Sequence, residues 1–240
     1  MNMSYIDPVI HIGGDEVNDY CYKTALKSIL AFENLTVAQA VSDWLKMLVN
    51  FVHKNQKVPM VWEEAILQYN ASSYPMIAQA WKGKNSINRL SEASDTLFIV
   101  DSSYDAYYLD CGRGSFIVGT KAGNSWCNPY KSWQHIYNHD ILANITKNAI
   151  DQVIGGELAL WTELVDVNNM DNLLWPRTAA GMETLWSGHL DQHGIVRTPV
   201  MALNRFQALR NWFHQLGYHP DVVQMLWCQM NKGDCLDPTL

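Results

Sequence analysis

Residues 9–16 read Val9-Ile10-His11-Ile12-Gly13-Gly14-Asp15-Glu16, an apolar segment that passes through two glycines into two adjacent carboxylates. The apolar residues predict a short buried strand, and the glycines permit a tight turn with close approach of a ligand. The two acids would then lie at the carboxyl end of the strand. Active sites in barrels and open sheets of parallel strands are built at that end.

The same turn has two simpler interpretations. Asp15 or Glu16 could face the positive N-terminal end of a following helix, with the glycines only turning the chain. His11, Asp15 and Glu16 could instead bind a metal, but they lack the ligand spacing of an HExxH motif. We therefore expect neither a metal nor a cofactor.

The composition narrows the class of protein. The chain has 240 residues, of which 48% are hydrophobic. It can bury one large core, and no apolar stretch approaches the roughly 18 residues of a membrane span. A net charge of -7 without a basic cluster argues against nucleic acid as a partner. The ten tryptophans are notable because flat indole faces suit sugar rings.

Strand-like and helix-like segments alternate along the chain, with no repeat or linker, so one domain over residues 1–240 is expected. Strands are predicted at 9–12, 58–62, 76–81, 96–100 and 152–161. Helices are predicted at 20–32, 37–52, 87–93, 136–149, 175–185 and 200–215. Residues 102–135 form a loop region too long to be a simple connector. This alternation indicates an α/β fold of the (β/α)8 TIM-barrel type.

Three predicted strands end in tryptophan: Trp62, Trp81 and Trp161. In the fifth strand, alternation with a period of two places Trp161 and Glu163 on one face and two leucines on the other. If the leucines face the helix layer, Trp161 and Glu163 lie at the mouth of the lumen. Three such indoles beside paired acids suggest the walls of a sugar pocket.

These residues together resemble glycoside hydrolase family 20, the β-N-acetylhexosaminidases. The ordered segments that carry the resemblance are HIGGDE at 11–16, VWEE at 61–64, AQAWKG at 78–83, YYLDCG at 107–112, GGELALWTE at 155–163, and Trp175-Pro176-Arg177 with Glu183. The family implies a retaining, substrate-assisted mechanism, in which the 2-acetamido oxygen of the sugar is the nucleophile. By the matching positions, Glu16 would be the general acid, Asp15 would hold the acetamido nitrogen, and Tyr108 would bind the acetamido oxygen.

The resemblance also implies a set of substrate-binding residues. The strand-end indoles would enclose the acetamido methyl group and the sugar face: Trp62, Trp81 and Trp161. Asp110 and Glu163 would accept hydrogen bonds from sugar hydroxyls, and Trp126 would stack on a neighbouring sugar or else anchor the loop to the barrel rim. The implied partners are N-acetylhexosamine-terminated glycans or chito-oligosaccharides, and a homodimer is also allowed.

Two alternatives differ in class. One is a catalytically incomplete fragment that acts only as a sugar-binding protein. The other is an ordinary two-carboxylate glycosidase that pairs Glu16 with Glu64 or Glu163. The first alternative arises because the strand bearing the acid pair is the fourth in the family's barrel. The chain is therefore expected to hold strands 4 to 8 only, the carboxyl-terminal portion of the catalytic barrel.

The five cysteines include no CxxC motif and fit an oxidising compartment. Cys111 could pair with Cys127 across the long loop, stabilising the fold by roughly 3 kcal/mol. Cys228 could pair with Cys235, which leaves Cys21, whose family counterpart often pairs with a cysteine upstream. The expected location is secreted or lysosomal, although residues 1–4 show no signal peptide.

Overall fold

The computed structural model describes residues 8–72, 74–83, 85–118, 123–231 and 235. Contacts between Cα atoms divide the chain into two compact units. The first comprises residues 1–103 and 141–156, and the second comprises residues 104–140 and 157–240.

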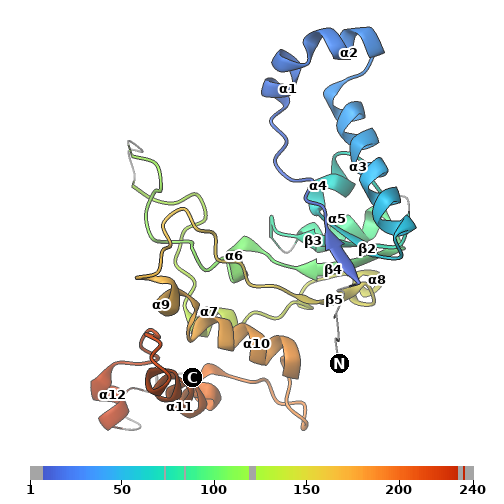
Figure 1. Cartoon of the computed structure of the whole chain (residues 1–240). Helices are drawn as coiled ribbons and strands as arrows, with labels where there is room; N and C mark the ends of the chain where they lie inside the picture. Colours follow the sequence, from blue (N-terminus) through green and yellow to red (C-terminus); the bar gives the residue numbers. More distant parts are fainter. Residues whose placement is uncertain (1–7, 73, 84, 119–122, 232–234, 236–240) are drawn as a thin grey trace, which may run out of the picture. The chain divides into compact units, whose positions relative to one another are not determined.

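The first unit is built on a sheet of five parallel strands in the order β1-β2-β3-β4-β5 (Figure 1). The strands are β1 (Val9–His11), β2 (Val58–Trp62), β3 (Met76–Ala80), β4 (Leu97–Asp101) and β5 (Val153–Gly156). The expected number and parallel direction of the strands are confirmed. Among the described residues the sheet is open, since β1 and β5 each pair with one neighbour.

The fifth strand is shorter than the sequence predicts. It ends at Gly156 rather than at residue 161, and its register against β4 shifts between Ile99 and Val100. Gly155 has a φ of +155°, a backbone conformation that L side chains rarely adopt. The alternation of side chains predicted through Trp161 is therefore not that of one continuous strand. In the second unit, Ala159 forms an isolated parallel bridge with Tyr108.

In the described part of the first unit, six helices accompany the sheet: α1 (Asp19–Ala25), α2 (Lys27–Glu33), α3 (Val37–Lys54), α4 (Glu63–Leu67), α5 (Asn85–Ala93) and α8 (Lys147–Ile150). The single helix predicted over 20–32 is divided at Leu26, whose φ and ψ of -107° and 15° interrupt the helical backbone. Helix α3 begins where predicted because Thr36 and Gln39 form a reciprocal capping box.

One face of the sheet packs against these helices. Its core contains buried residues from α3, α4, α5 and three strands, among them Leu45, Val61, Ala65, Ala78 and Leu90. Because side chains alternate along a strand, the neighbours of Val61 and Ala78 point to the opposite face. That opposite face therefore carries Trp62 and Gln79.

The second unit is mainly helical: α6 (Tyr104–Tyr107), α7 (Trp133–Tyr137), α9 (Met170–Leu174), α10 (Arg177–Ser187), α11 (Pro199–Gln215) and α12 (Leu226–Met230). Its aromatic core joins Trp133 and Phe206, with ring centroids 5.0 Å apart. The prediction of a single helix over 136–149 is wrong. Ser132 and Thr146 each accept a hydrogen bond from a backbone N–H three residues on, so two separate helices, α7 and α8, begin after them.

Both suggested disulfides are present, Cys111–Cys127 and Cys228–Cys235. Cys21 is an exposed free thiol. Within the described part of the chain, every helix is too short or too polar to traverse a lipid bilayer.

The contribution of the first unit's core to stability can be tested at Leu90, which lies on α5 and is fully buried. We expect Leu90→Ala to lower the free energy of unfolding by about 2–5 kcal/mol, through lost transfer energy and the cavity that remains. Glu92→Ala, on the exposed face of the same helix, should change it by less than about 0.5 kcal/mol. Urea unfolding of the whole chain measures both, and equal losses would contradict this core assignment.

Candidate active site in two groups of side chains

The turn that carries the two acids has an unusual backbone. Gly13, Gly14 and Glu16 all have positive φ, of 74°, 101° and 44°. A Cβ atom on Gly14 would lie 2.9 Å from the Cβ of Ala65, so glycine is required there by space as well as by conformation. Glu16 is not glycine, and holding it in the left-handed region costs about 1–2 kcal/mol. Strain of this kind is concentrated at functional sites.

The acids are not helix caps. The N-cap of α1 is Asn18, whose side-chain oxygen accepts a hydrogen bond from the backbone N–H of Cys21 at 2.9 Å. Asp15 and Glu16 are exposed. Asp15 also borders a mostly apolar cavity of about 420 Å³ beside helices α1 to α3. The simpler interpretation of the turn therefore does not hold.

The acid-bearing turn is bound to the end of β2. The backbone N–H of Trp62 donates to the carbonyl oxygen of Gly13 at 3.1 Å. The Nδ1 atom of His11 accepts the N–H of Gly13 at 3.0 Å, and its ring centroid lies 5.2 Å from that of Trp62. The His11 side chain is exposed.

Trp81, after β3, is bound by two buried acids at the start of α4. The indole Nε1–H of Trp81 donates to both carboxylate oxygens of Glu64, at 3.2 and 3.0 Å. Its backbone N–H donates to Glu63 at 3.3 Å. Lys82 forms an ion pair with Glu64, with Nζ and Oε1 2.7 Å apart. These contacts argue against Glu64 as the second carboxylate of a two-carboxylate glycosidase.

Gln79 is a polar residue of this region that the sequence reasoning missed. It lies beside Trp62 in the register of β2 and β3, on the face opposite the helix-packed core. The residue is buried, and its Nε2 atom has no hydrogen-bond acceptor among the described residues. A buried donor without an acceptor is costly, and a bound ligand could supply the missing partner. The only sequence signal was a polar residue inside an otherwise apolar strand.

In the second unit, a short backbone pairing brings two predicted segments together. Leu109 N–H donates to the carbonyl oxygen of Ala159 at 2.8 Å. This pairing brings Asp110 beside Trp161, whose backbone N–H donates to the Asp110 carboxylate at 3.2 Å. The ring centroids of Tyr108 and Trp161 are 6.0 Å apart. Residues 108–110 and residues 159–161, from two distant segments, are thus neighbours.

The long loop adds Trp126 to this second group. The disulfide between Cys111 and Cys127 closes the loop, and the Trp126 ring lies 6.3 Å from that of Tyr108. The loop's return is tight, since a Cβ on Gly112 would lie 2.0 Å from the backbone nitrogen of Tyr130. Gly112 also has a φ of +81°, so only glycine fits there.

The ionisation of Asp110 reflects its surroundings. Burial raises the pKa of its carboxyl group, and the negative charge of Glu163 raises it further, whereas the Trp161 N–H and the charge of Arg177 lower it. Arg177 is itself buried and donates to the carbonyl oxygens of Leu109, Lys131 and Leu173. It therefore fixes the backbone just before Asp110. From the sequence, Arg177 was only part of a motif and had no predicted role.

The predicted site residues thus form two groups. The first unit holds Asp15, Glu16, Trp62 and Trp81, and the second holds Tyr108, Asp110, Trp126, Trp161 and Glu163. Among the described residues, the ligand-type side chains close enough to share a metal ion are Asp110, Cys111 and Cys127, and both sulfurs are already in a disulfide. His11, Asp15 and Glu16 form no such group.

The chain matches known proteins over most of its length. Residues 1–189 match the model of the glycosyl hydrolase family 20 catalytic domain. The chain is 30% identical to a β-hexosaminidase from Emericella nidulans, covering 96% of this chain and 42% of the relative. It is 34% identical to a probable β-hexosaminidase from Drosophila melanogaster, covering 94% and 34%. A chitooligosaccharidolytic β-N-acetylglucosaminidase from Ostrinia furnacalis is 33% identical, covering 95% and 39%.

A solved structure shares the fold. A family 20 exo-β-N-acetylglucosaminidase from Vibrio harveyi, in complex with N-acetylglucosamine, matches with a TM-score of 0.72 and 20% identity. The match covers 91% of this chain and 34% of that one. The chain therefore spans between about a third and two fifths of the length of these relatives.

Glu63 gives a pH-dependent test of the buried acids. Burial raises the pKa of its carboxyl group, outweighing the hydrogen bonds from Ser86 and Trp81 that lower it. Between the ordinary and the raised pKa, the folded chain binds more protons than the unfolded chain. The free energy of unfolding due to this group therefore falls as pH rises through that window.

We expect Glu63→Gln to remove the pH-dependent contribution of this carboxyl group to the free energy of unfolding. Relative to the unsubstituted chain, the variant should gain stability as pH rises from about 4 to 7. Urea unfolding at several pH values measures the difference between the two proteins, which cancels the contributions of other groups. A difference that is constant with pH, or that shrinks as pH rises, would contradict the raised pKa.

Proposed function

The chain belongs to glycosyl hydrolase family 20, and from that premise we propose that it forms the acid-bearing part of a β-N-acetylhexosaminidase. The enzyme would remove terminal N-acetylglucosamine or N-acetylgalactosamine with retention of configuration. One observation carries the proposal: a strained left-handed turn exposes Asp15 and Glu16 at the carboxyl end of a parallel strand, while Asn18 caps the helix that follows.

In the proposed mechanism the substrate supplies its own nucleophile. The acetamido carbonyl oxygen attacks the anomeric carbon as Glu16 gives its proton to the departing glycosidic oxygen. Asp15 accepts a hydrogen bond from the acetamido N–H and stabilises its developing positive charge, while Tyr108 donates to the acetamido oxygen. Glu16, now a carboxylate, takes a proton from water, which opens the cyclic oxazolinium intermediate. Both acids are thereby used without a carboxylate nucleophile.

The remaining predicted residues would bind the sugar. The indoles would enclose the acetamido methyl group and one sugar face: Trp62, Trp81 and Trp161. Asp110 and Glu163 would accept hydrogen bonds from hydroxyl groups, and Trp126 would stack on a neighbouring sugar. The aromatic contacts of Tyr108 with Trp126 and Trp161 support this assignment within the second unit. The substrates would be N-acetylhexosamine-terminated glycans or chito-oligosaccharides, met in a secreted or lysosomal location.

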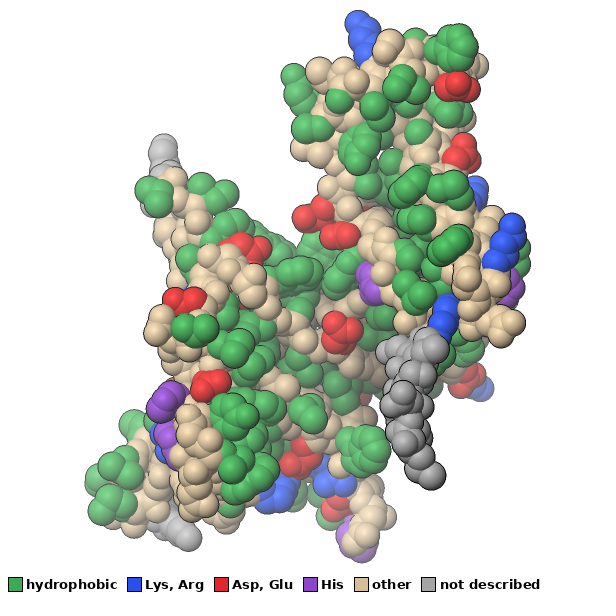
Figure 2. Space-filling model, viewed as in Figure 1, with side chains coloured by type: hydrophobic (Ala, Val, Ile, Leu, Met, Phe, Trp, Pro, Cys, Tyr) green, Lys and Arg blue, Asp and Glu red, His purple; other side chains and the backbone are tan. Residues whose placement is uncertain are grey.

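We further propose that the five strands are strands 4 to 8 of an eight-stranded barrel. The order of the sheet supports this, because its five described strands are all parallel and do not close into a barrel, whereas an all-parallel sheet ordinarily has its edges and faces covered. The exposed apolar side chains on the outer side of α3 also support it: Trp44, Met47 and Phe51 are 56%, 51% and 66% exposed. Figure 2 shows hydrophobic side chains gathered over this helix and its neighbours.

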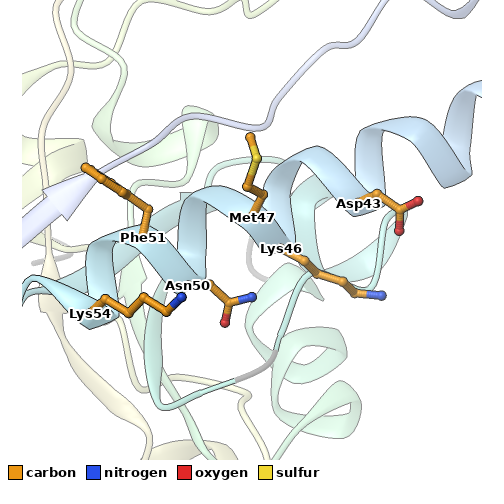
Figure 3. A pocket seen from close by; sticks show the side chains of 6 residues that line it. All are labelled: Asp43, Lys46, Met47, Asn50, Phe51 and Lys54. Atoms are coloured by element: carbon orange, nitrogen blue, oxygen red, sulfur yellow. The ribbon is translucent and has the colours of Figure 1, made fainter.

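The same stretch of α3 borders a shallow, open hollow of about 440 Å³. Figure 3 shows Met47 and Phe51 projecting from one side of the helix, and Lys46, Asn50 and Lys54 from the other. Apolar and charged side chains side by side are typical of a surface that packs against another helix at its centre and meets water at its rim. A further β/α unit beside β1 would cover the apolar part.

The partial barrel predicts that the chain needs more polypeptide for activity. We expect residues 1–240 alone not to hydrolyse a chromogenic N-acetylglucosaminide. A chimera that places before them the part of the Emericella nidulans relative preceding its match should hydrolyse it. Turnover by the isolated chain would show that five strands suffice. Binding of an oxazoline-like inhibitor without turnover by either protein would favour the sugar-binding alternative.

Glu16 is tested in that chimera. Glu16→Gln keeps the shape of the side chain but cannot donate or accept the proton, so kcat/KM on a chito-disaccharide should fall roughly 100- to 10,000-fold. Glu92→Gln, an exposed acid on α5, is the matched control and should leave the rate unchanged. Near-normal turnover by Glu16→Gln would refute the acid role.

The nature of the nucleophile is tested by the substrate itself. Replacing its N-acetyl group by a hydroxyl removes the attacking oxygen, so the assisted mechanism should lose nearly all its rate. A glycosidase that pairs Glu16 with Glu163 would keep most of it, and Glu163→Gln would then abolish turnover.

A further inference from the structure

Two consecutive glutamates at the start of α4 have no part in the proposed mechanism, and yet both are buried. Glu63 and Glu64 directly follow Trp62 at the end of β2 and are 1% and 2% exposed. A buried carboxylate is costly unless other groups bind it. The groups that bind these two therefore indicate what the acids do.

Glu64 is directed at the ring of Trp81. An indole has one polar atom, Nε1, which can only donate a hydrogen bond. In Trp81 this atom lies 3.2 and 3.0 Å from the two carboxylate oxygens of Glu64. A charged acceptor makes this bond stronger than a neutral one, and its direction restricts rotation of the ring about the side-chain torsions.

Lys82 completes the arrangement from the solvent side. Its Nζ atom is 2.7 Å from Oε1 of Glu64 and 5.0 Å from the centroid of the Trp81 ring. The Lys82 side chain is 40% exposed whereas that of Glu64 is 2% exposed. The cation therefore compensates the buried charge and also lies over the ring that Glu64 holds.

Glu63 provides an internal comparison. It is as buried as Glu64 and belongs to the same turn of helix, but its contact with Trp81 is to the backbone N–H at 3.3 Å, not to the ring. Replacing one acid or the other therefore separates the loss of a buried charge from the loss of the ring's own acceptor.

We propose that Glu64, with Lys82 as its counter-ion, is a positioning residue that fixes the orientation of the Trp81 indole. The consequence for substrate binding rests on the proposed function, in which Trp81 forms one wall of the pocket for the acetamido group. A fixed indole would give that wall its shape before the substrate binds. The size of N-acyl group that the site accepts would then depend on Glu64, which need not touch the sugar.

The first experiment needs no catalysis. In the whole chain labelled with ¹⁵N-tryptophan, the Trp81 indole resonance is identified as the one lost in Trp81→Phe. We expect its Nε1–H to exchange with solvent far more slowly than that of the exposed Trp44. Glu64→Gln replaces the charged acceptor by a neutral amide, so exchange at Trp81 should speed up roughly 10- to 100-fold. Glu63→Gln should change it less than about twofold.

Equal exchange in Glu64→Gln and the unsubstituted chain would overturn the proposal, as would fast exchange of Trp81 in the unsubstituted chain. If Glu64→Gln does not fold, Lys82→Met serves instead, since Lys82 is on the surface. It should also speed up exchange at Trp81, by a smaller factor, and no change there would overturn the role of Lys82.

The second experiment uses the active chimera and measures its specificity for the N-acyl group of the substrate. Loosening one wall of the pocket should admit a larger acyl group, so Glu64→Gln should lower the preference for N-acetyl over N-propanoyl glycosides roughly tenfold. A role confined to stability would lower the melting temperature and leave this ratio unchanged. If the unsubstituted chimera is inactive, the proposed function fails, while the exchange experiment still decides whether Glu64 positions Trp81.

Discussion

The close approach of Gly14 to Ala65 is the constraint on which the first group of site residues depends. A single methyl group on Gly14 would meet the Ala65 side chain at 2.9 Å, so the turn after β1 packs directly on α4. In the same turn, the carbonyl oxygen of Gly13 accepts a hydrogen bond from the backbone N–H of Trp62. In the turn that these contacts hold, Gly13 and Gly14 have positive φ, and Glu16 is exposed with a φ of +44°.

Helix α4 links this turn to the next strand end. Its third residue, Ala65, packs on Gly14, and its first two residues, Glu63 and Glu64, bind Trp81. A helix of five residues thus connects the acids after β1 with the indole after β3. The second group of site residues is organised differently, by the backbone pairing of Leu109 with Ala159 and by a disulfide that returns the long loop.

Local signals predicted β2, β3, β4 and several helices correctly, whereas β1 lies where predicted but is partly exposed rather than buried. The apolar runs at β2, β3 and β4 are bounded by turn residues, and Thr36 with Gln39 is a recognisable capping box at α3. The predictions of element boundaries failed where one continuous apolar or helical pattern spans two different structural elements. The apolar run 152–161 reads as one strand, yet it leaves the sheet after Gly156, and the helical pattern of 136–149 hides a new start at Thr146.

The sequence by itself determined which chemistry-bearing residues the chain has, and the order in which they follow the strands, because strand ends and glycine turns are encoded locally. Only the tertiary structure decided the conformation of Glu16, the burial of Glu64 against Trp81, and the burial of the Gln79 Nε2 atom without an acceptor among the described residues. Each of these depends on atoms from segments far apart in the chain, and no local pattern of residues specifies which distant side chain will meet them.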